Sequence, residues 1–252
     1  MTFAERLLLK LSCTPGTART DLNLDDWTPE NALRNWRDVV PGFDDEIKGK
    51  SLVDFACGLG YQAIALIQNG AQRVLGIDSN PEVLEAARAT IRAQGLESQI
   101  VLKSALDATD SGTFDIVLSQ NGMEHFEHPA EVLDTMLSGL KRGGKMLLTF
   151  GPPWLSPYGA HMQFFTNLPW VNLLFSERTV MNVRGRFRDD GLHTYEPVLN
   201  RMTLEKFEGL MKRTRLTIEY RQYDCIKRLN ALRSLPLIRE LFVNRVTVVG
   251  RR

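Results

Sequence analysis

The sequence predicts an α/β fold in which helices cover both faces of a parallel sheet. Three features of the 252-residue chain predict it. Between residues 49 and 150 short apolar runs alternate with stretches of helical periodicity, glycines end the helical stretches, and an aromatic-rich segment follows the fifth apolar run. The composition, with 43% hydrophobic and 24% charged residues and a formal net charge of +1, is that of a globular protein without an overall bias toward nucleic acid or membrane.

The chain begins with a segment that stands apart from this alternation. Its first apolar run, "MTFAERLLLKLSC", is interrupted by charges and is too short for a secretory signal or a membrane-spanning helix, so we expect an amphipathic helix. Thr28 and Pro29 have the pattern of a second helix start. The three cysteines lack metal-type spacing, which favours a reduced, cytoplasmic protein. We therefore treat residues 1–48 as an N-terminal helical cap segment.

Five apolar runs are strand candidates, and three periodic stretches are helix candidates. The strand candidates are Ser51–Ala56, Arg73–Asp78, Gln99–Lys103, Phe114–Gln120 and Lys145–Phe150. The helix candidates lie near residues 60–69, 81–94 and 130–141. Gly70 and Gly95 are placed to end the first two helices. Strands separated by helices in this way predict a parallel sheet.

The alternation stops at residue 151. Residues 151–200 are rich in proline and aromatic residues, and a long irregular segment of this kind is usually a lid or a binding segment. Regular patterns return at "MTLEKFEGLMKRT", where Thr203 is placed to cap a helix, and continue in the strands "LTIEYRQYDCI" and "FVNRVTVVG". Two strands joined without another regular helix predict an antiparallel hairpin at the sheet edge. Residues 49–252 therefore form one domain with an insertion at 151–200.

The stretch "LVDFACGLGYQAIALI", residues 52–67, ends an apolar run in an acid and enters a helix through two glycines. The segment from Gly58 to Ala63 satisfies G-x-G-x-x-G/A, and Asp78 lies 20 residues after Gly58. By spacing alone this pattern also fits a dinucleotide-binding protein. The choice between nucleotides therefore depends on charge.

Asp54 decides against a dinucleotide. Its carboxylate is expected at the end of the first strand, beside the turn, and residues 51–72 contain no Lys or Arg to offset it. A pyrophosphate placed there would be repelled by several kcal/mol. S-adenosylmethionine has no phosphate, and its sulfonium and ammonium groups favour a nearby acid. Asp78 ends the second strand in "VLGIDSNPEVLEAAR", where a carboxylate can accept both ribose hydroxyls; a simple helix cap is the alternative.

Four stretches carry a family resemblance. They are "VDFACGLG", "VLGIDSNPEVLEAAR", "FDIVLSQNGMEHFEHP" and "LKRGGKMLLTF". Their order and intervals resemble those of class I S-adenosylmethionine-dependent methyltransferases over residues 48–151. The resemblance implies an enzyme with S-adenosyl-L-methionine as its cofactor. It also implies a Rossmann-like sheet of seven strands with the last strand antiparallel, helices on both faces, and an aromatic-rich insertion after strand five.

The resemblance assigns the cofactor-binding residues. It implies that the methionine part, the ribose and the transferable methyl are contacted by Asp54, Ala56, Gly58, Gly60, Asp78, Ser79, Gln120 and Asn121. Ala56 stands where the family usually has glycine. After the third strand, "LKSALDAT" lacks the acid that often holds the adenine amino group, because Asp107 is offset by two residues. We therefore expect Ala105 and Leu106 to contact the adenine.

Three residues are candidates for the chemistry. Methyl transfer needs the nucleophile, methyl and sulfur nearly in line, so positioning supplies most of the catalysis. A hydroxyl nucleophile must also lose its proton, and we expect His125 or His161 to accept it, with Glu124 orienting His125 or bridging to the insertion. A structural His125 is the alternative. The same three residues resemble a divalent-metal ligand set, but those enzymes have Glu where this chain has Asn121, so we expect no metal.

The insertion is expected to set specificity. Four of its aromatic residues are predicted to bind substrate: Trp154, Tyr158, Phe164 and Trp170. Packing as core is one alternative for the run "NLPWVNLLF", and peripheral contact with a membrane is another.

The predicted function is methyl transfer to a hydroxyl of a small organic or glycan-type acceptor, with no nucleic-acid partner. A protein that binds S-adenosylmethionine without turnover is one alternative, and an NAD-binding Rossmann protein is the weakest. An RNA methyltransferase is supported only by residues 201–252, whose 13 Lys and Arg against 5 Asp and Glu give a charge of +8.

Overall fold

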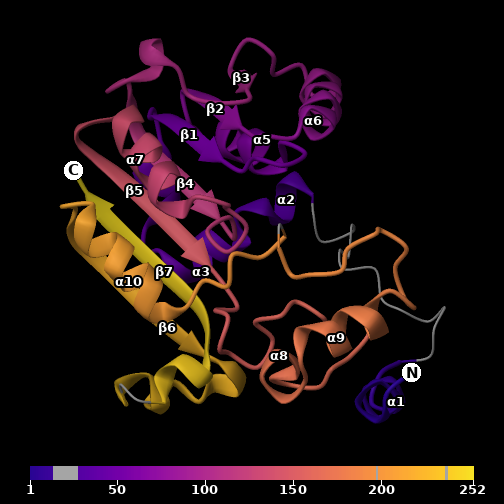
Figure 1. Cartoon of the computed structure of the whole chain (residues 1–252). Helices are drawn as coiled ribbons and strands as arrows, with labels where there is room; N and C mark the ends of the chain where they lie inside the picture. The colour runs from indigo at the N-terminus through magenta and orange to yellow at the C-terminus, as the bar shows by residue number, and fades with distance from the viewer. Residues whose placement is uncertain (14–27, 197, 236–237) are drawn as a thin grey trace.

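A seven-stranded sheet forms the centre of the computed structural model, which describes residues 1–13, 28–196, 198–235 and 238–252 (Figure 1). The strands are β1 (Ser51–Phe55), β2 (Arg73–Ile77), β3 (Ile100–Lys103), β4 (Phe114–Gln120), β5 (Leu140–Phe150), β6 (Thr217–Cys225) and β7 (Val243–Arg251). They lie in the order β3-β2-β1-β4-β5-β7-β6. Strands β1 to β5 pair in parallel, whereas β7 pairs antiparallel with both β5 and β6. The predicted sheet and its edge hairpin are therefore confirmed.

Helices lie on both faces of this sheet (Figure 1). The α-helices are α1 (Phe3–Lys10), α2 (Pro29–Ala32), α3 (Arg34–Val39), α4 (Phe43–Ile47), α5 (Tyr61–Gln68), α6 (Pro81–Ala93), α7 (Pro129–Gly139), α8 (Val171–Leu174), α9 (Glu177–Arg184) and α10 (Leu204–Arg213). Short 3-10 turns are η2 (Ala108–Asp110), η3 (Ile226–Arg228), η4 (Asn230–Ser234) and η5 (Arg239–Leu241). The helices predicted near residues 60–69, 81–94 and 130–141 are α5, α6 and α7.

Two apolar cores separate the helices from the sheet. On one face, α3 to α6 contribute residues such as Trp36 and Ile64. On the other face, α7 and α10 contribute residues such as Phe207. Successive side chains of a strand point to opposite faces, so Leu52 belongs to the first core and its neighbour Val53 to the second. All five residues of β1 are buried, which explains its continuous apolar sequence.

The main departure from the predicted boundaries is the start of β5. This strand begins at Leu140, five residues before the predicted Lys145. Phe114 pairs with Leu140 and Ile116 pairs with Lys145, so the ladder contains an irregularity there. The added residues include exposed charges and two glycines, and they carry no apolar pattern from which a strand is predicted.

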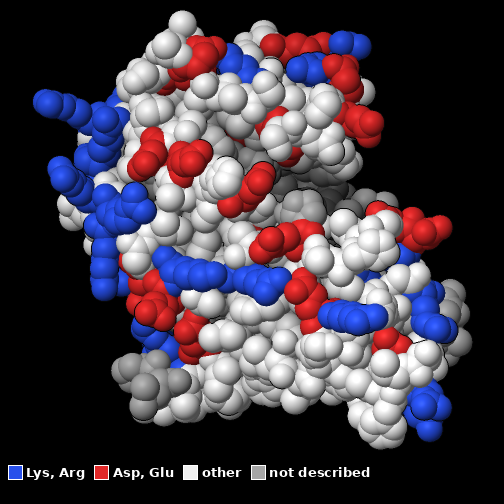
Figure 2. Space-filling model, viewed as in Figure 1, with Lys and Arg blue, Asp and Glu red and all other residues white. Residues whose placement is uncertain are grey.

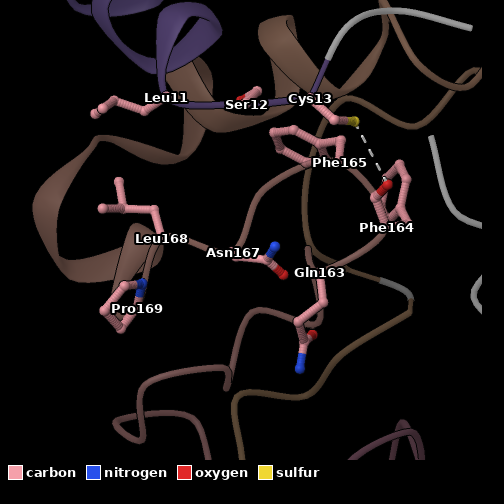
Figure 3. Close-up of a pocket in the computed structure, with 9 residues that line it drawn as sticks. All are labelled: Leu11, Ser12, Cys13, Gln163, Phe164, Phe165, Asn167, Leu168 and Pro169. Carbon is pink, nitrogen blue, oxygen red and sulfur yellow. Dashed lines mark hydrogen bonds between the residues drawn. The ribbon is translucent and has the colours of Figure 1, made fainter. Parts of the chain in front are cut away.

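The insertion has a core of its own, which the N-terminal helix completes. Leu8 of α1 is fully buried in a cluster with Phe164, Phe165 and Val180 of the insertion. The Cys13 N–H donates a 2.8 Å hydrogen bond to the Phe165 carbonyl, and the Cys13 thiol faces the Phe164 carbonyl (Figure 3). A hollow of about 460 Å³ lies beside this contact. The expected cap segment therefore packs on the insertion through α1, while residues 14–27 lie outside the described part of the chain.

Part of the positive charge of residues 201–252 is paired. Arg239 binds Glu208, Arg245 binds Asp224 and Arg251 binds Glu219. Figure 2 shows Lys and Arg side chains gathered along the edge where Figure 1 places the C-terminus and α10.

Candidate active site

The carboxyl ends of β1, β2 and β4 bring the predicted cofactor residues to one edge of the sheet. In an open α/β sheet this edge, at the point where the strand order reverses between β1 and β4, is where ligands bind. Asp54 pairs with Gly76 in β2 and with Leu118 in β4. Asp78 directly follows β2, and Gln120 ends β4.

The turn after β1 has three residues in the left-handed region. Gly58 and Gly60 have φ of 52° and 80°, which suits glycine because it has no Cβ. Ala56 has φ of 63°, so the position where the resembling family usually has glycine keeps a glycine-like backbone conformation. A side chain at Gly60 would also press on Ile91 of α6 at 3.3 Å. These conformations hold the backbone of the turn close to the start of α5.

Asp54 is a buried carboxylate with unused hydrogen-bonding capacity. The side chain has no exposed surface, Oδ1 accepts a 2.5 Å hydrogen bond from Gln62, and Oδ2 has no partner. Burial raises the pKa of Asp54 to about 7, against the Gln62 hydrogen bond, and Asp78 adds to the rise. An unpaired buried carboxylate oxygen costs free energy that a nearby cation would offset. This residue therefore fits the positively charged methionine part of S-adenosylmethionine.

Asp78 joins the glycine turn to the start of α6. Its Oδ2 accepts a hydrogen bond from the Gly58 N–H and its Oδ1 accepts one from the Asn80 N–H, both at 3.0 Å. Asn80, rather than Asp78, caps α6 through the N–H groups of Glu82 and Val83. Each carboxylate oxygen has a second lone pair, so both remain able to accept a hydroxyl hydrogen.

The residues expected around the adenine and ribose lie on the surface of the same edge. Ser79 and Ala105 are exposed, and Leu106 is half-buried against the core. Asp107 is engaged elsewhere, because it caps η2 and pairs with Lys103. Asp107, which lies two residues from the position of the family's adenine-binding acid, therefore has a structural role.

Gln120 and Asn121 end β4 beside a closely packed turn. The side-chain Oε1 of Gln120 is buried without a partner. Asn121 takes a left-handed φ of 54° and donates its N–H to the Thr149 carbonyl. A Cβ at Gly122 would lie 2.7 Å from the Ser119 hydroxyl, so a larger residue there would displace the Ser119 side chain.

The structure brings the two candidate bases together. The rings of His125 and His161 are 5.5 Å apart and nearly edge to face. His125 is exposed, and its Nδ1 lies 2.7 Å from the Val198 carbonyl oxygen. A carbonyl only accepts, so Nδ1 carries the hydrogen and Nε2 of neutral His125 has the free lone pair.

Glu124 is buried beside His125, and His161 is half-buried with its Nε2 turned away from solvent. Burial, and to a lesser degree the charge of His125, lowers the pKa of His161 to about 4, and its Nε2 has no partner. Burial raises the pKa of Glu124, whose Oε1 accepts the Gly151 N–H at 3.1 Å while Oε2 is unpaired. Within residues 1–13, 28–196, 198–235 and 238–252, no three His, Cys, Asp or Glu side chains are arranged to hold a metal ion.

The aromatic residues of the insertion mostly contact each other. Phe164 is buried within the insertion core, next to Phe165 and under the Arg188 guanidinium. Trp154 packs edge to face on Tyr195, and Trp170 packs edge to face on Phe242, which precedes β7. Tyr158 is half-buried. Phe164 therefore packs in the core of the insertion, whereas the sequence predicted that it binds substrate.

Sequence reasoning missed two residues that shape this site. Gln62 holds Asp54, and the only local signal was a polar residue in the first turn after the glycines. Asn200, at the end of the insertion, donates from its side chain to the carbonyls of Met123 and Phe126, at 2.7 Å each. Its N–H also donates to the Glu124 carbonyl. No motif in the sequence indicated Asn200.

The strand order, with β7 antiparallel between β5 and β6, is the fold of solved class I S-adenosylmethionine-dependent methyltransferases. The chain has this fold, and the family match together with the structural neighbours supports S-adenosyl-L-methionine as its cofactor. Residues 52–144 match the family model described as a methyltransferase domain. A solved structure of an S-adenosylmethionine-dependent methyltransferase from Mesorhizobium loti is similar in fold, with a TM-score of 0.57 and 21% identity over 90% of this chain and 99% of that one.

Curated relatives match in the same region. A ribosomal protein L11 methyltransferase from Tolumonas auensis is 38% identical over 95 residues, which are 38% of this chain and 31% of the relative. One from Vibrio cholerae is 32% identical over 105 residues, covering 41% of this chain and 34% of the relative. The chain therefore spans about a third of the length of the curated relatives it matches.

These relatives correct the expected acceptor. They are named for a ribosomal protein, so the prediction of a small-molecule or glycan-type partner is wrong. Its physical basis was an aromatic pocket, but Phe164 packs inside the insertion and Val171 of "NLPWVNLLF" belongs to the same core. The alternative that this run contacts a membrane is dropped for the same reason. In the described part of the chain, no helix has the length and apolar character needed to cross a bilayer.

Proposed function

We propose that this protein transfers the methyl group of S-adenosylmethionine to an amine nitrogen of a protein acceptor. The cofactor supplies an electrophilic methyl on a sulfonium. Asp54, with its unpaired Oδ2, and Asp78, with lone pairs left over, are proposed to hold the methionine and ribose parts. Ala105 and Leu106 are proposed to contact the adenine, and Gln120 and Asn121 to lie near the methyl.

The observation that carries the proposed acceptor is a set of unpaired acceptor atoms from the end of β4, the loop after it and the insertion. Glu124 Oε2, His161 Nε2 and Gln120 Oε1 are all buried, and none has a donor. A hydroxyl offers one hydrogen, whereas an amine or ammonium offers two or three. A ligand that is rich in donors fits this lining best, because unpaired buried acceptors cost about 1–3 kcal/mol each.

His125 and His161 are proposed to have different roles in the proton chemistry. An ammonium must lose a proton before it attacks, and Nε2 of His125 has the free lone pair for it. His161, with a pKa of about 4, stays neutral at physiological pH and acts as an acceptor that orients the amine. The names of the matched relatives support a protein as the carrier of the amine. The insertion, residues 151–200, is proposed to bind the acceptor, since it supplies His161.

Transfer of labelled methyl from S-adenosylmethionine into a fractionated lysate tests this function. Label is expected in protein, at a lysine or N-terminal amine located by mass spectrometry, and stable to mild base. His125→Gln is expected to lower the rate by about 10²-fold or more while S-adenosylmethionine binding is unchanged. Label confined to small molecules, or released by mild base as from an ester, would overturn the proposed acceptor.

A further inference from the structure

Trp36, which belongs to the N-terminal cap segment, lies at one end of a hydrogen-bonded chain that reaches the cofactor site. Its indole Nε1–H donates to Gln62 Oε1 at 2.7 Å, and Gln62 Nε2 donates to Asp54 Oδ1 at 2.5 Å. The three residues come from α3, the first turn of α5 and the end of β1. The chain therefore connects a segment outside the parallel strands to the acid expected to face the cofactor.

The direction of this chain is set by Trp36. An indole N–H is only a donor, so it pairs with the oxygen of the Gln62 amide and not with the nitrogen. The amide NH2 must then face Asp54, where a carboxylate accepts it. With the amide reversed, two donors would meet at Trp36 and two acceptors at Asp54. Trp36 thus removes the freedom of amide orientation that an isolated glutamine has.

Packing fixes Trp36 in place. The side chain has no exposed surface and stacks on Phe43 of α4, with ring centroids 5.8 Å apart and planes within 10°. Both rings belong to the core between the helices and the sheet, together with Ile64. A donor held this rigidly keeps Gln62 on Oδ1 and leaves Oδ2 of Asp54 without a partner.

We propose that Trp36 is a positioning residue for the cofactor: through Gln62 it holds Asp54 in the orientation and charge state that bind the cationic part of S-adenosylmethionine. The inference rests on the proposed function only through the identity of that cofactor. Gln62 favours the ionised carboxylate, because the hydrogen bond is to the charged form. The other titratable groups described around Asp54 are Asp78, which disfavours that form, and Cys57, which is kept neutral because burial raises its pKa.

Two variants separate this role from simple packing. Trp36→Phe keeps an aromatic ring against Phe43 but removes the N–H, and Gln62→Met keeps the length of the side chain but removes both hydrogen bonds. Each is expected to weaken S-adenosylmethionine binding at pH 7 about tenfold, measured by calorimetry. Each is also expected to move the pH midpoint of binding upward, because Asp54 loses the donor that favours its ionised form. Phe43→Leu is the comparison variant, since it removes the stack but keeps the N–H and the rest of the core around Trp36, and it should weaken binding clearly less than Trp36→Phe does.

The double variant Trp36→Phe/Gln62→Met gives the decisive comparison. If the indole acts through Gln62, Trp36→Phe weakens binding no further in a Gln62→Met background. The proposed action of Trp36 on Asp54 through Gln62, here called the relay, would be overturned by either of two results. One is an equal loss from Trp36→Phe in the wild-type and Gln62→Met backgrounds. The other is a loss in Phe43→Leu as large as in Trp36→Phe. Should Trp36→Phe fail to fold, Gln62→Met alone still decides, because unchanged affinity and pH midpoint in that variant contradict the proposal. Absence of binding to the wild-type protein would overturn the proposed function as well, whereas normal binding by the variants overturns only the relay.

Discussion

At the scale of single residues, Asp54 lowers the stability of the protein in the ionised form that cofactor binding is expected to need. It is a fully buried acid with one hydrogen-bond donor and one unpaired oxygen. Burial, with Asp78 as a smaller contributor, raises its pKa to about 7 against the effect of Gln62. The protein therefore keeps, at the end of β1, a carboxylate that is expensive to ionise until a cation is bound.

The raised pKa predicts how cofactor affinity depends on pH. A cationic ligand prefers ionised Asp54, so binding of S-adenosylmethionine should strengthen as pH rises from 5.5 through about 7 and then level off. Below the midpoint, the affinity should fall by up to about tenfold per pH unit, with a proton released on binding. Calorimetry in buffers of different ionisation enthalpy measures both quantities. An affinity that is flat in this window would contradict the assignment of Asp54.

The same shift predicts the stability of Asp54→Asn. Asp54 has a folded pKa above its unfolded value, so its ionisation costs stability from about pH 4 upward, and the full cost is present above pH 7. Asn removes this cost, and the free energy of unfolding should rise by up to about 4 kcal/mol at pH 7.5 with little change at pH 4. Urea denaturation at the two pH values is the measurement. A variant less stable than the wild type at pH 7.5 would show that the carboxylate is stabilised in the folded protein.

The loop after β4 is the element on which the acceptor side depends. It holds Glu124 and His125, yet it has no regular structure between β4 and α7. Its conformation is fixed from the far end of the insertion, because Asn200 binds the carbonyls of Met123, Glu124 and Phe126. The insertion therefore positions the candidate base as well as supplying His161.

Replacing Asn200 tests this element. Asn200→Leu removes the two side-chain hydrogen bonds and should destabilise the protein by about 1–3 kcal/mol. Because the loop is proposed to lie on the acceptor side, the turnover rate should fall by about tenfold or more while S-adenosylmethionine affinity stays within about twofold.

Thr203→Ala is the control for Asn200→Leu. It removes the N-cap of α10, costs about 1 kcal/mol, and touches no residue of the loop. Its turnover rate should therefore remain that of the wild type. An equal loss of rate in both variants would mean that stability alone, rather than the loop, sets the activity.

At the scale of the whole molecule, local patterns predicted the sheet but not the contacts between distant segments. Strands β1, β2 and β4 are mostly buried and apolar, so their sequence pattern follows directly from their burial. The first residues of β5 are exposed and charged, and its start was missed for that reason. The contacts of Trp36 with Gln62 and of Asn200 with Met123 join residues far apart in the chain, and such pairs leave no pattern in either segment.

The insertion illustrates the same limit for function. Its aromatic residues were interpreted as a substrate pocket, because pocket and core use the same residue types. In the folded protein, Phe164 and Phe165 form a core that Leu8 of α1 completes. This core therefore forms only when the cap segment and the insertion pack together, and neither segment indicates it alone. The positions of Asp54 and Asp78 at the ends of β1 and β2 were predictable, because acids at strand ends are themselves a local signal.

Calorimetric titration of the wild-type protein with S-adenosylmethionine and with NAD+, alongside Asp78→Ala, tests the central claim most directly. We predict micromolar binding of S-adenosylmethionine, no binding of the dinucleotide, and an affinity at least about tenfold weaker in Asp78→Ala, roughly 1.4 kcal/mol. Binding of NAD+ without binding of S-adenosylmethionine would contradict this prediction, since a diphosphate would then tolerate the acids at the ends of β1 and β2.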